Sequence, residues 1–368
     1  MNCPEIQTDY AVSRMSCSRF QPCRSGRGIS NFSICLNYSQ ILFGSVVGKR
    51  YLCSPEPKQE YCNMKYGIIG TGAIGGYYGA KLAHAGQEVH FLLRSDFEYV
   101  KQHGLQVDSC DGSFHLDDVN AYLYTEDMPP CDVVLVCLKS VNNGKLQSLL
   151  PPLLHDKTLV VLIQNGIGVE EDVQKMFPDV QLAAGLAFIC SAKTEPGRVN
   201  HQCYGSINLA NYSCKDEALM QTVVDEFRQA GIETGLVEYH EARWKKAVWN
   251  MPFNGMTVAL HTQTDLLLKN KSTRQLIREQ MMEVVSAAQH LGVKNLDAAF
   301  VDKMIDMTDA MTPYSPSMRL DYDFHRRMEI YYLYTRPIEI AREAGYQMPK
   351  LEMLEAELRF LEEKNKTI

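Results

Sequence analysis

The feature that most constrains this chain is a glycine-rich loop near residue 70. Residues 65–76 read Lys-Tyr-Gly-Ile-Ile-Gly-Thr-Gly-Ala-Ile-Gly-Gly, so Gly70, Gly72 and Gly75 form a G-x-G-x-x-G between a short apolar run and a helix-forming stretch. The first glycine allows a tight turn, the second lets a pyrophosphate approach the backbone, and the third lets helix and strand pack closely. The sequence predicts a bound nucleotide at this helix N-terminus, contacted also by Thr71, Ala73 and Ile74. A glycine turn without function is the alternative.

Composition indicates an ordinary globular protein. The 368 residues are enough for two domains, and 45% are apolar and 22% charged. A net charge of −7 argues against a nucleic-acid partner, because such proteins present basic surfaces to phosphates. Since no apolar run approaches the roughly 18–20 residues that span a bilayer, no membrane association is expected.

The first 63 residues differ from the rest. Residues 10–55 contain no Asp or Glu, six Arg or Lys and many serines. Residues 1–63 are therefore predicted to lie outside the folded core, either as a transit peptide, which is typically rich in Arg and Ser, or as an upstream extension of the gene model before Met64. The second alternative predicts a cytoplasmic protein, and the first predicts a plastid or the mitochondrial matrix.

No metal site is predicted from the cysteines and histidines. Half of the twelve cysteines fall in the first 63 residues, no C-x-x-C pair occurs, and the ten histidines show no H-E-x-x-H spacing. The remaining cysteines are interpreted as small buried residues in a reducing compartment.

From residue 64 to residue 236 the pattern predicts a Rossmann-type α/β domain. A strand ending at Ile69, a helix over 73–84 and a strand over 88–93 form a βαβ unit, and the apolar runs 132–137 and 158–163 are typical of parallel strands covered on both faces. The sheet is therefore expected to be doubly wound. Between residues 180 and 236 alternation predicts an antiparallel addition, with a turn at Pro196-Gly197, Gly205 between two short strands, and a helix over 216–230.

Residues 237–368 are predicted to form an all-α domain. Helices are expected over 238–260, 272–291, 296–307, 325–344 and 350–364. Because small ligands usually bind between two domains, the site residues should come from both.

Arg94 favours NADP over NAD. It follows the second predicted strand, about 20 residues beyond the glycine motif, where an acid would select the free ribose 2′-OH of NAD. A guanidinium suits a 2′-phosphate, although Asp96 stands two residues on, and a solvated arginine at a strand end is the alternative.

A polar stripe on the first predicted helix of the second domain is the candidate catalytic element. Lys246, Asn250 and Asn254 lie at i, i+4 and i+8 and share one helix face. Such groups are unfavourable to bury without partners, which a polar substrate would supply. Pro252 predicts a kink or break. A solvated lysine with two capping asparagines is the alternative.

The chain resembles the ketopantoate reductase (2-dehydropantoate 2-reductase) family from Met64 essentially to its end. The resemblance rests on motifs in order: Gly70 to Gly75, Arg94, Lys139 in Val-Cys-Leu-Lys, Asn165 in Gln-Asn-Gly-Ile-Gly, Lys246, Asn250, Asn254, Ser317 and Glu329. It implies that Lys246 is the general acid that protonates the substrate ketone as a nicotinamide delivers hydride. It also implies substrate binding by Asn165, Asn250, Asn254 and Ser317, and cofactor contacts by Asn165, Lys139 and Glu329.

This sequence departs from the family pattern at three places. Asn254-Gly255 stands where Asn-Pro is common, Arg319 and Leu320 alter a Ser-Ser-Met-Leu-Gln-Asp-like run, and residues 188–195 fit loosely. The resemblance therefore implies NADPH-dependent reduction of 2-dehydropantoate to (R)-pantoate, in pantothenate and coenzyme A synthesis, with another 2-oxo acid as the alternative. A non-catalytic NADP-binding redox sensor is the competing class. The long C-terminal helices leave a homodimer possible.

Overall fold

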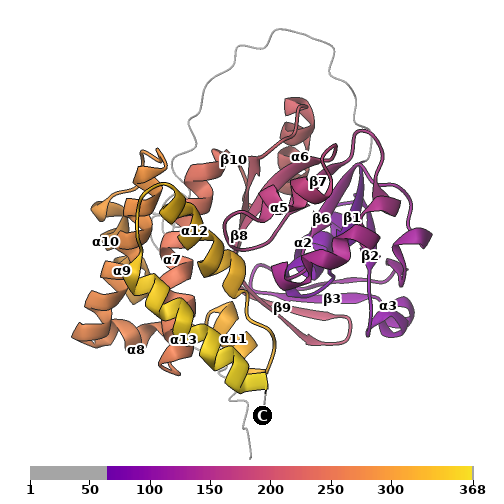
Figure 1. Ribbon diagram of the computed structural model, residues 1–368. Helices are drawn as coiled ribbons and strands as arrows, with labels where there is room; N and C mark the ends of the chain where they lie inside the picture. The colour runs from indigo at the N-terminus through magenta and orange to yellow at the C-terminus, as the bar shows by residue number, and fades with distance from the viewer. Residues whose placement is uncertain (1–63, 367–368) are drawn as a thin grey trace, which may run out of the picture.

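The computed structural model describes residues 64–366, and the predicted N-terminal extension, 1–63, lies outside them. Two bodies stand side by side in Figure 1: a sheet with flanking helices, in indigo to magenta, and a group of helices in orange and yellow. No helix among residues 64–366 is both long and apolar enough to cross a membrane.

The first body is built on a ten-stranded sheet. The strand order is β4-β3-β9-β8-β7-β6-β1-β2-β5, with β10 beside β9. The bounds are β1 (Lys65–Ile69), β2 (Glu88–Leu92), β3 (Leu105–Ser109), β4 (Phe114–Leu116), β5 (Asn120–Tyr122), β6 (Val133–Val136), β7 (Leu159–Leu162), β8 (Gln181–Glu195), β9 (Arg198–Asn211) and β10 (Leu236–Val237). Strands β5, β2, β1, β6, β7 and β8 run parallel to one another, which confirms the predicted parallel strands β1, β2, β6 and β7.

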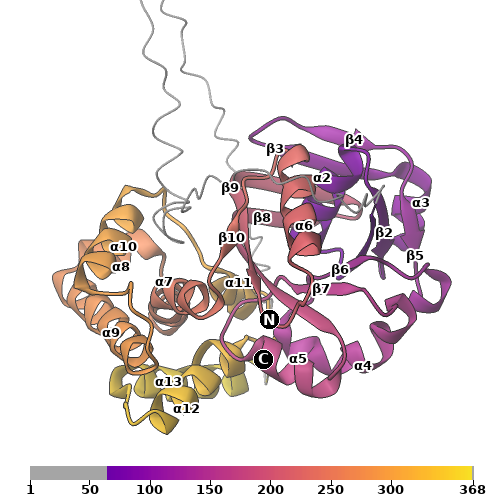
Figure 2. The same ribbon diagram turned by 90° about the horizontal axis from the view of Figure 1, so that it is seen from above.

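Helices cover both faces of this sheet, which confirms the doubly wound architecture. Side chains alternate along each strand: on β6, Val133 and Leu135 pack with α2 (Ala73–His84) and α6 (Glu217–Gln229). Val134 and Val136 pack on the other face with α4 (Leu146–Leu149) and α5 (Val169–Met176). Figure 2 shows these helix pairs on opposite sides. The uninterrupted apolar runs in the sequence follow from this double burial.

The antiparallel addition is the long hairpin of β8 and β9, which turns at Gly197. The prediction that Gly205 separates two short strands was wrong. Gly205 lies within β9 at a register shift, where its φ of +114° suits a glycine and bends the strand without ending it. Along the chain, three further short strands, β3, β4 and β5, and helix α3 (Phe97–His103) come between β2 and β6.

The second body is entirely helical among the described residues. Its helices are α7 (Tyr239–Ala259), α8 (Thr264–Lys269), α9 (Lys271–His290), α10 (Ala298–Ala310), α11 (Ser317–Asp323), α12 (Arg336–Glu343) and α13 (Pro349–Lys366). Helix α7 packs against α9, α11 and α13 and so forms the centre of the group. We propose 64–236 and 237–368 as the two domains.

Pro252 does not break its helix, and one predicted helix starts late. Helix α7 continues through Pro252, because its neighbours Met251 and Phe253 are fully buried and their packing offsets the roughly 3 kcal/mol that an internal proline costs. The predicted helix over 325–344 starts late: a π turn, η5 (Tyr331–Thr335), leads into α12. Before it, the backbone N–H of Met328 donates to the Glu362 carboxylate at 2.8 Å instead of to a helical carbonyl.

Candidate active site

The glycine loop has the geometry that nucleotide binding requires. Gly70 has a φ of +98°, and a Cβ there would lie 2.7 Å from the backbone nitrogen of Leu138 at the end of β6. A Cβ on Gly75 would lie 2.4 Å from the carbonyl oxygen of Gly70, so only glycine lets α2 pack against β1. By contrast, a Cβ on Gly72 would meet nothing within 4 Å. The open position is the one where a pyrophosphate approaches the backbone.

Strand β8 connects this loop to the catalytic candidate Lys246. Ser191 Oγ donates to the Ala73 carbonyl at 3.3 Å, and Lys193 Nζ donates to the Thr71 carbonyl at 3.4 Å. Four residues before Ser191, the carbonyl of Ala187 accepts a hydrogen bond from Lys246 Nζ at 2.8 Å. The segment that fitted the family pattern loosely, 188–195, therefore lies along the loop and continues toward the lysine.

Arg94 and Asp96 have opposite environments. Arg94 is exposed beyond β2, and its side chain makes no hydrogen bond or ion pair to any of residues 64–366. Asp96 is 4% exposed, forms an ion pair with Lys193 and accepts the backbone N–H of Gly197 at 3.3 Å. The Asp96 carboxylate, which argued against NADP, is thus already bound by two residues of the β8–β9 hairpin.

Lys246 lies in a small pocket between the two bodies. The pocket is lined by Gly166, Ile167, Arg243, Lys246, Ala247, Asn250, Tyr332, Leu333 and Pro337. Burial lowers the pKa of Lys246 to about 7; the like charge of Arg243 contributes, while Glu329 acts in the opposite direction. An amine with a pKa near neutrality is well suited to proton transfer.

Asn250 is brought to the same pocket, whereas Asn165 follows β7 immediately before Gly166. Asn250 is 8% exposed. Within residues 64–366, neither carboxamide donates or accepts a side-chain hydrogen bond. Because buried amides are normally paired, the free carboxamide of Asn250 fits a site that awaits a polar ligand.

Asn254 does not line this pocket. It is 2% exposed; its Nδ2 donates to the Asn250 carbonyl at 3.0 Å, and its Oδ1 accepts the backbone N–H of Met318 at 3.1 Å. Asn254 therefore fixes the first turn of α11 against α7. Ser317, the first residue of α11, is held next to this contact and is partly exposed.

Lys139 and Glu329 join the two bodies beside the end of β6. Lys139 forms an ion pair with Asp321, which is 1% exposed and also accepts from Arg326 Nε at 2.9 Å. Glu329 accepts from the backbone N–H and the hydroxyl of Ser140, at 2.9 and 2.7 Å. The two predicted residues thus sit in adjacent inter-domain contacts, one from each body.

Arg243, Glu170 and Asp321 were missed by the sequence analysis. Arg243 is 2% exposed, pairs with the fully buried Glu170 of α5, and donates to the Gln164 carbonyl at 2.6 Å. Tyr239 also donates to Glu170, at 2.7 Å. The position of Arg243 three residues before Lys246, on the same helix face, was the available signal.

The departures from the family pattern have local structural reasons. A Cβ on Gly255 would lie 2.6 Å from both the Tyr334 hydroxyl and Leu354 Cδ2, so close packing on α7 requires glycine. Arg319 donates to the Thr257 carbonyl at 2.9 Å and pairs with Asp323, and Leu320 is exposed. Neither Arg319 nor Leu320 lines the pocket around Lys246.

Family models match both bodies. Residues 66–213 match the ketopantoate reductase PanE/ApbA model, and residues 238–362 match its C-terminal counterpart. Together they cover most of the described chain.

Similar proteins agree with these matches. A 2-dehydropantoate 2-reductase from Nostoc sp. is 43% identical over 309 residues, which are 82% of this chain and 97% of that protein. The crystal structure of 2-dehydropantoate 2-reductase from Geobacter metallireducens GS-15 is 37% identical, with a TM-score of 0.78 over 80% of this chain and 99% of that one. A D-mandelate dehydrogenase, solved with NADH and anilino(oxo)acetate, shares the fold at 23% identity and a TM-score of 0.75, covering 82% and 99%. The chain, with its glycine loop facing a helical domain that carries Lys246, belongs to the ketopantoate reductase family of oxidoreductases.

Proposed function

We propose that this protein reduces 2-dehydropantoate (ketopantoate) to (R)-pantoate with NADPH, a step of pantothenate and coenzyme A biosynthesis. The observation that carries the proposal is a near-neutral lysine, Lys246, held by the same strand that runs along the glycine loop. Its relatives named 2-dehydropantoate 2-reductase support the choice of substrate.

The reaction needs a proton where negative charge develops. When bound, the nicotinamide dinucleotide supplies the hydride that adds to the ketone carbon. Lys246 then gives its ammonium proton to the ketone oxygen, which leaves the alcohol and a neutral amine that is reprotonated from water. Because the pKa of Lys246 is about 7, both the charged and neutral forms are accessible near neutral pH, which favours general acid catalysis.

The rest of the chain binds and orients the reactants. Asn250 contacts the substrate hydroxyl, Ser317 the carboxylate, and Asn165 both substrate and nicotinamide ribose. Asn254 uses its carboxamide to hold Asn250 and the start of α11, and in this way it positions Ser317. In this proposal it also contacts the substrate hydroxyl. Two contacts hold the two bodies together beside the site: Lys139 pairs with Asp321, and Glu329 accepts a hydrogen bond from Ser140.

The preference for NADPH rests on Arg94. In dinucleotide-binding folds the residue at the end of the second strand meets the adenosine ribose, and the exposed guanidinium of Arg94, which follows β2, would pair with a 2′-phosphate there. Asp96, the acid two residues beyond Arg94, is already paired with Lys193 and the backbone of Gly197. The Arg94 guanidinium is therefore free to pair with a 2′-phosphate, whereas the Asp96 carboxylate is not free to select a 2′-OH.

A different 2-oxo acid is the second candidate, because a D-mandelate dehydrogenase shares this fold. The deciding experiment follows loss of NADPH absorbance with ketopantoate and with a panel of branched and hydroxylated 2-oxo acids. The proposal expects the highest kcat/KM with ketopantoate, and a low rate with NADH. A higher kcat/KM with another 2-oxo acid of the panel would identify that acid as the substrate. If NADPH were consumed with none of the acids, a non-catalytic NADP-binding sensor would be favoured instead.

Three properties outside the chemistry are also proposals. Pairing through the helical domain into a homodimer is tested by light scattering during gel filtration. N-terminal sequencing of native protein distinguishes a cleaved organelle peptide from a start at Met64, and with it the cytoplasmic and organelle locations.

A further inference from the structure

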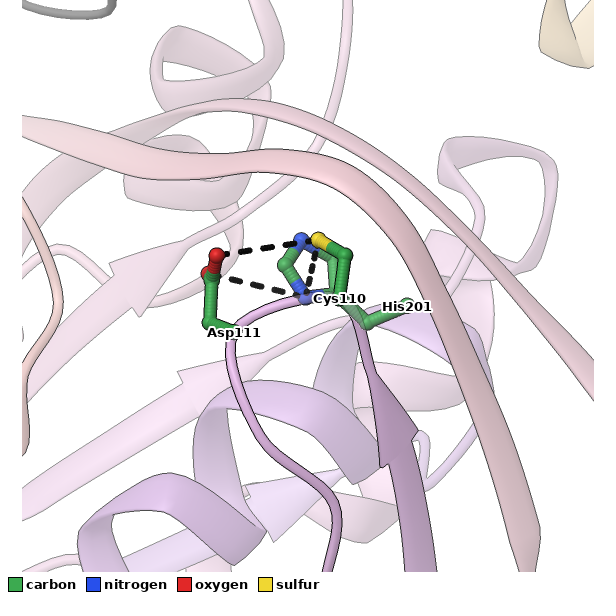
Figure 3. A group of neighbouring side chains, drawn as sticks. All are labelled: Cys110, Asp111 and His201. Atoms are coloured by element: carbon green, nitrogen blue, oxygen red, sulfur yellow. Dashed lines mark hydrogen bonds and ion pairs between the residues drawn. The ribbon is translucent and has the colours of Figure 1, made fainter. Parts of the chain in front are cut away.

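Outside the active site, one group of side chains has the composition of a metal centre. Cys110 and Asp111 lie on the turn that follows β3, and His201 lies on the neighbouring strand β9. Figure 3 shows the thiol, carboxylate and imidazole directed toward one another. Of the residues 64–366, these three alone bring together three or more possible ligand atoms, all within 4.8 Å of one another.

The distances between the ligand atoms approach those around a tetrahedral ion. They are 3.8 Å from Cys110 Sγ to His201 Nδ1, 3.9 Å from Nδ1 to Asp111 Oδ2, and 3.7 Å from Sγ to Asp111 Oδ1. A zinc ion bonded at about 2.3 Å to sulfur and 2.0–2.1 Å to nitrogen and oxygen separates such atoms by roughly 3.4–3.6 Å. Shifts of a few tenths of an ångström on an exposed turn close this difference.

His201 is oriented as a ligand by the surrounding protein. Its side chain is fully buried, and its ring packs against Tyr77 with centroids 4.4 Å apart. Its Nε2 is 3.1 Å from the carbonyl oxygen of Tyr204, so Nε2 carries the proton and Nδ1 presents its lone pair to the turn. A backbone carbonyl that fixes the far ring nitrogen is the usual outer contact of a metal-bound histidine.

The backbone keeps the turn in place beside this histidine. Ser109 and His201 are paired in the parallel register of β3 and β9, and Cys110 N donates to the His201 carbonyl at 3.1 Å. The Ser109 hydroxyl lies 2.8 Å from Nδ1 and also accepts from Asp111 N at 3.1 Å. A metal ion would replace the serine hydroxyl at Nδ1, while the backbone contact remains.

We propose that Cys110, Asp111 and His201 bind a divalent cation of the zinc class, with water as the fourth ligand. Sulfur, imidazole nitrogen and carboxylate oxygen together suit a borderline ion such as Zn²⁺ or Co²⁺ better than Mg²⁺ or Ca²⁺, which prefer oxygen. The ion would join the β3 turn to β9 beside Tyr77 of α2. The proposal is independent of the reductase activity. No local spacing indicates this site, because Cys110 and His201 are 91 residues apart.

Cobalt provides the test, because a Co²⁺ ion bonded to a thiolate has a characteristic charge-transfer absorption. The full-length protein, kept reduced with a phosphine, is titrated with Co²⁺. We expect a saturable thiolate band that Zn²⁺ abolishes and that is lost in Cys110→Ser. Asp111→Asn should weaken binding by at least about tenfold. Both residues are exposed, so neither substitution should prevent folding.

Matched controls distinguish this site from other thiols and acids of the chain. Cys203→Ser removes a nearby thiol, and Asp117→Asn an exposed carboxylate; both should keep the full band. Zinc should also raise the Tm of the wild type and not that of Cys110→Ser. The proposal is overturned if the full-length protein shows no thiolate band, if Cys110→Ser retains it entirely, or if Cys203→Ser loses it equally.

Discussion

Lys246 donates a hydrogen bond from Nζ to the carbonyl of Ala187, at 2.8 Å. The donor belongs to the helical domain and the acceptor to β8, the strand whose later residues Ser191 and Lys193 touch the glycine loop. One strand therefore sets the distance between the nucleotide loop and the amine. This relationship makes the position of the lysine depend on the sheet as well as on α7.

Lys246→Ala should reduce kcat with little effect on NADPH affinity. General acid catalysis by a placed side chain contributes typically 10²- to 10⁴-fold, so a fall of about that size is expected in steady-state assays, with NADPH binding measured separately by fluorescence. Lys269→Ala is the control, because Lys269 is an exposed lysine of the same domain. Near-normal turnover in Lys246→Ala would remove the lysine from the mechanism.

The pH profile of kcat/KM should fall as the pH rises through about 7. The free enzyme loses its proton donor there, because burial and Arg243 lower the pKa of Lys246 while Glu329 raises it. Glu329→Gln removes the negative charge but keeps an oxygen that can accept from Ser140, so the falling limb should move to lower pH. An unchanged limb would mean that the titration belongs to another group.

Arg94→Ala should lower the preference for NADPH over NADH. A hydrogen bond to a charged group is worth about 1.5–3 kcal/mol, so kcat/KM for NADPH should drop about 10- to 100-fold while that for NADH changes little. Asp96→Asn is the informative comparison. Since Asp96 is turned toward Lys193 and Gly197, its neutralisation should leave the cofactor ratio unaltered, and a large change in that ratio would contradict this orientation.

Alanine at two glycines of one loop should have separate effects. In Gly75→Ala the new Cβ meets the Gly70 carbonyl at 2.4 Å, and overpacking of this kind costs about 1–3 kcal/mol, so the Tm should fall. In Gly72→Ala nothing lies within 4 Å, so the Tm should be retained while the Kd for NADPH rises. Equal loss of stability in both variants would contradict an open position at Gly72.

Periodicity and spacing predicted the central parallel strands and a shared helix face for Lys246 and Asn250, but they failed where distant groups decide local structure. The apolar runs around β6 and β7 form parallel strands as predicted, and Lys246 and Asn250 line one pocket. The late start of the helix before α12 depends on Glu362 binding Met328 N, 34 residues away. Likewise, Asp96 and Lys193 are 97 positions apart in the chain, so their pairing, which occupies the acid beside Arg94, could not be read from the sequence.

The buried pair Arg243–Glu170 should be the most sensitive inter-domain contact to substitution of one partner. Both side chains are at most 2% exposed, so Glu170→Gln leaves an arginine charge without its counter-ion, and such a change typically costs about 3–5 kcal/mol. Urea unfolding should show a large loss. Turnover should fall as well, because Arg243 also holds the Gln164 carbonyl next to Asn165.

A double-mutant cycle separates this pairing from simple packing loss. Glu170→Gln combined with Arg243→Met removes both charges, so its free energy of unfolding should fall by less than the sum of the two single losses. The exposed pair Arg278–Asp302 gives the reference, since disrupting it should cost no more than about 1 kcal/mol. Strictly additive losses at Arg243 and Glu170 would mean that the two charges do not stabilise each other, and that the domains are held at this point by the surrounding apolar contacts alone.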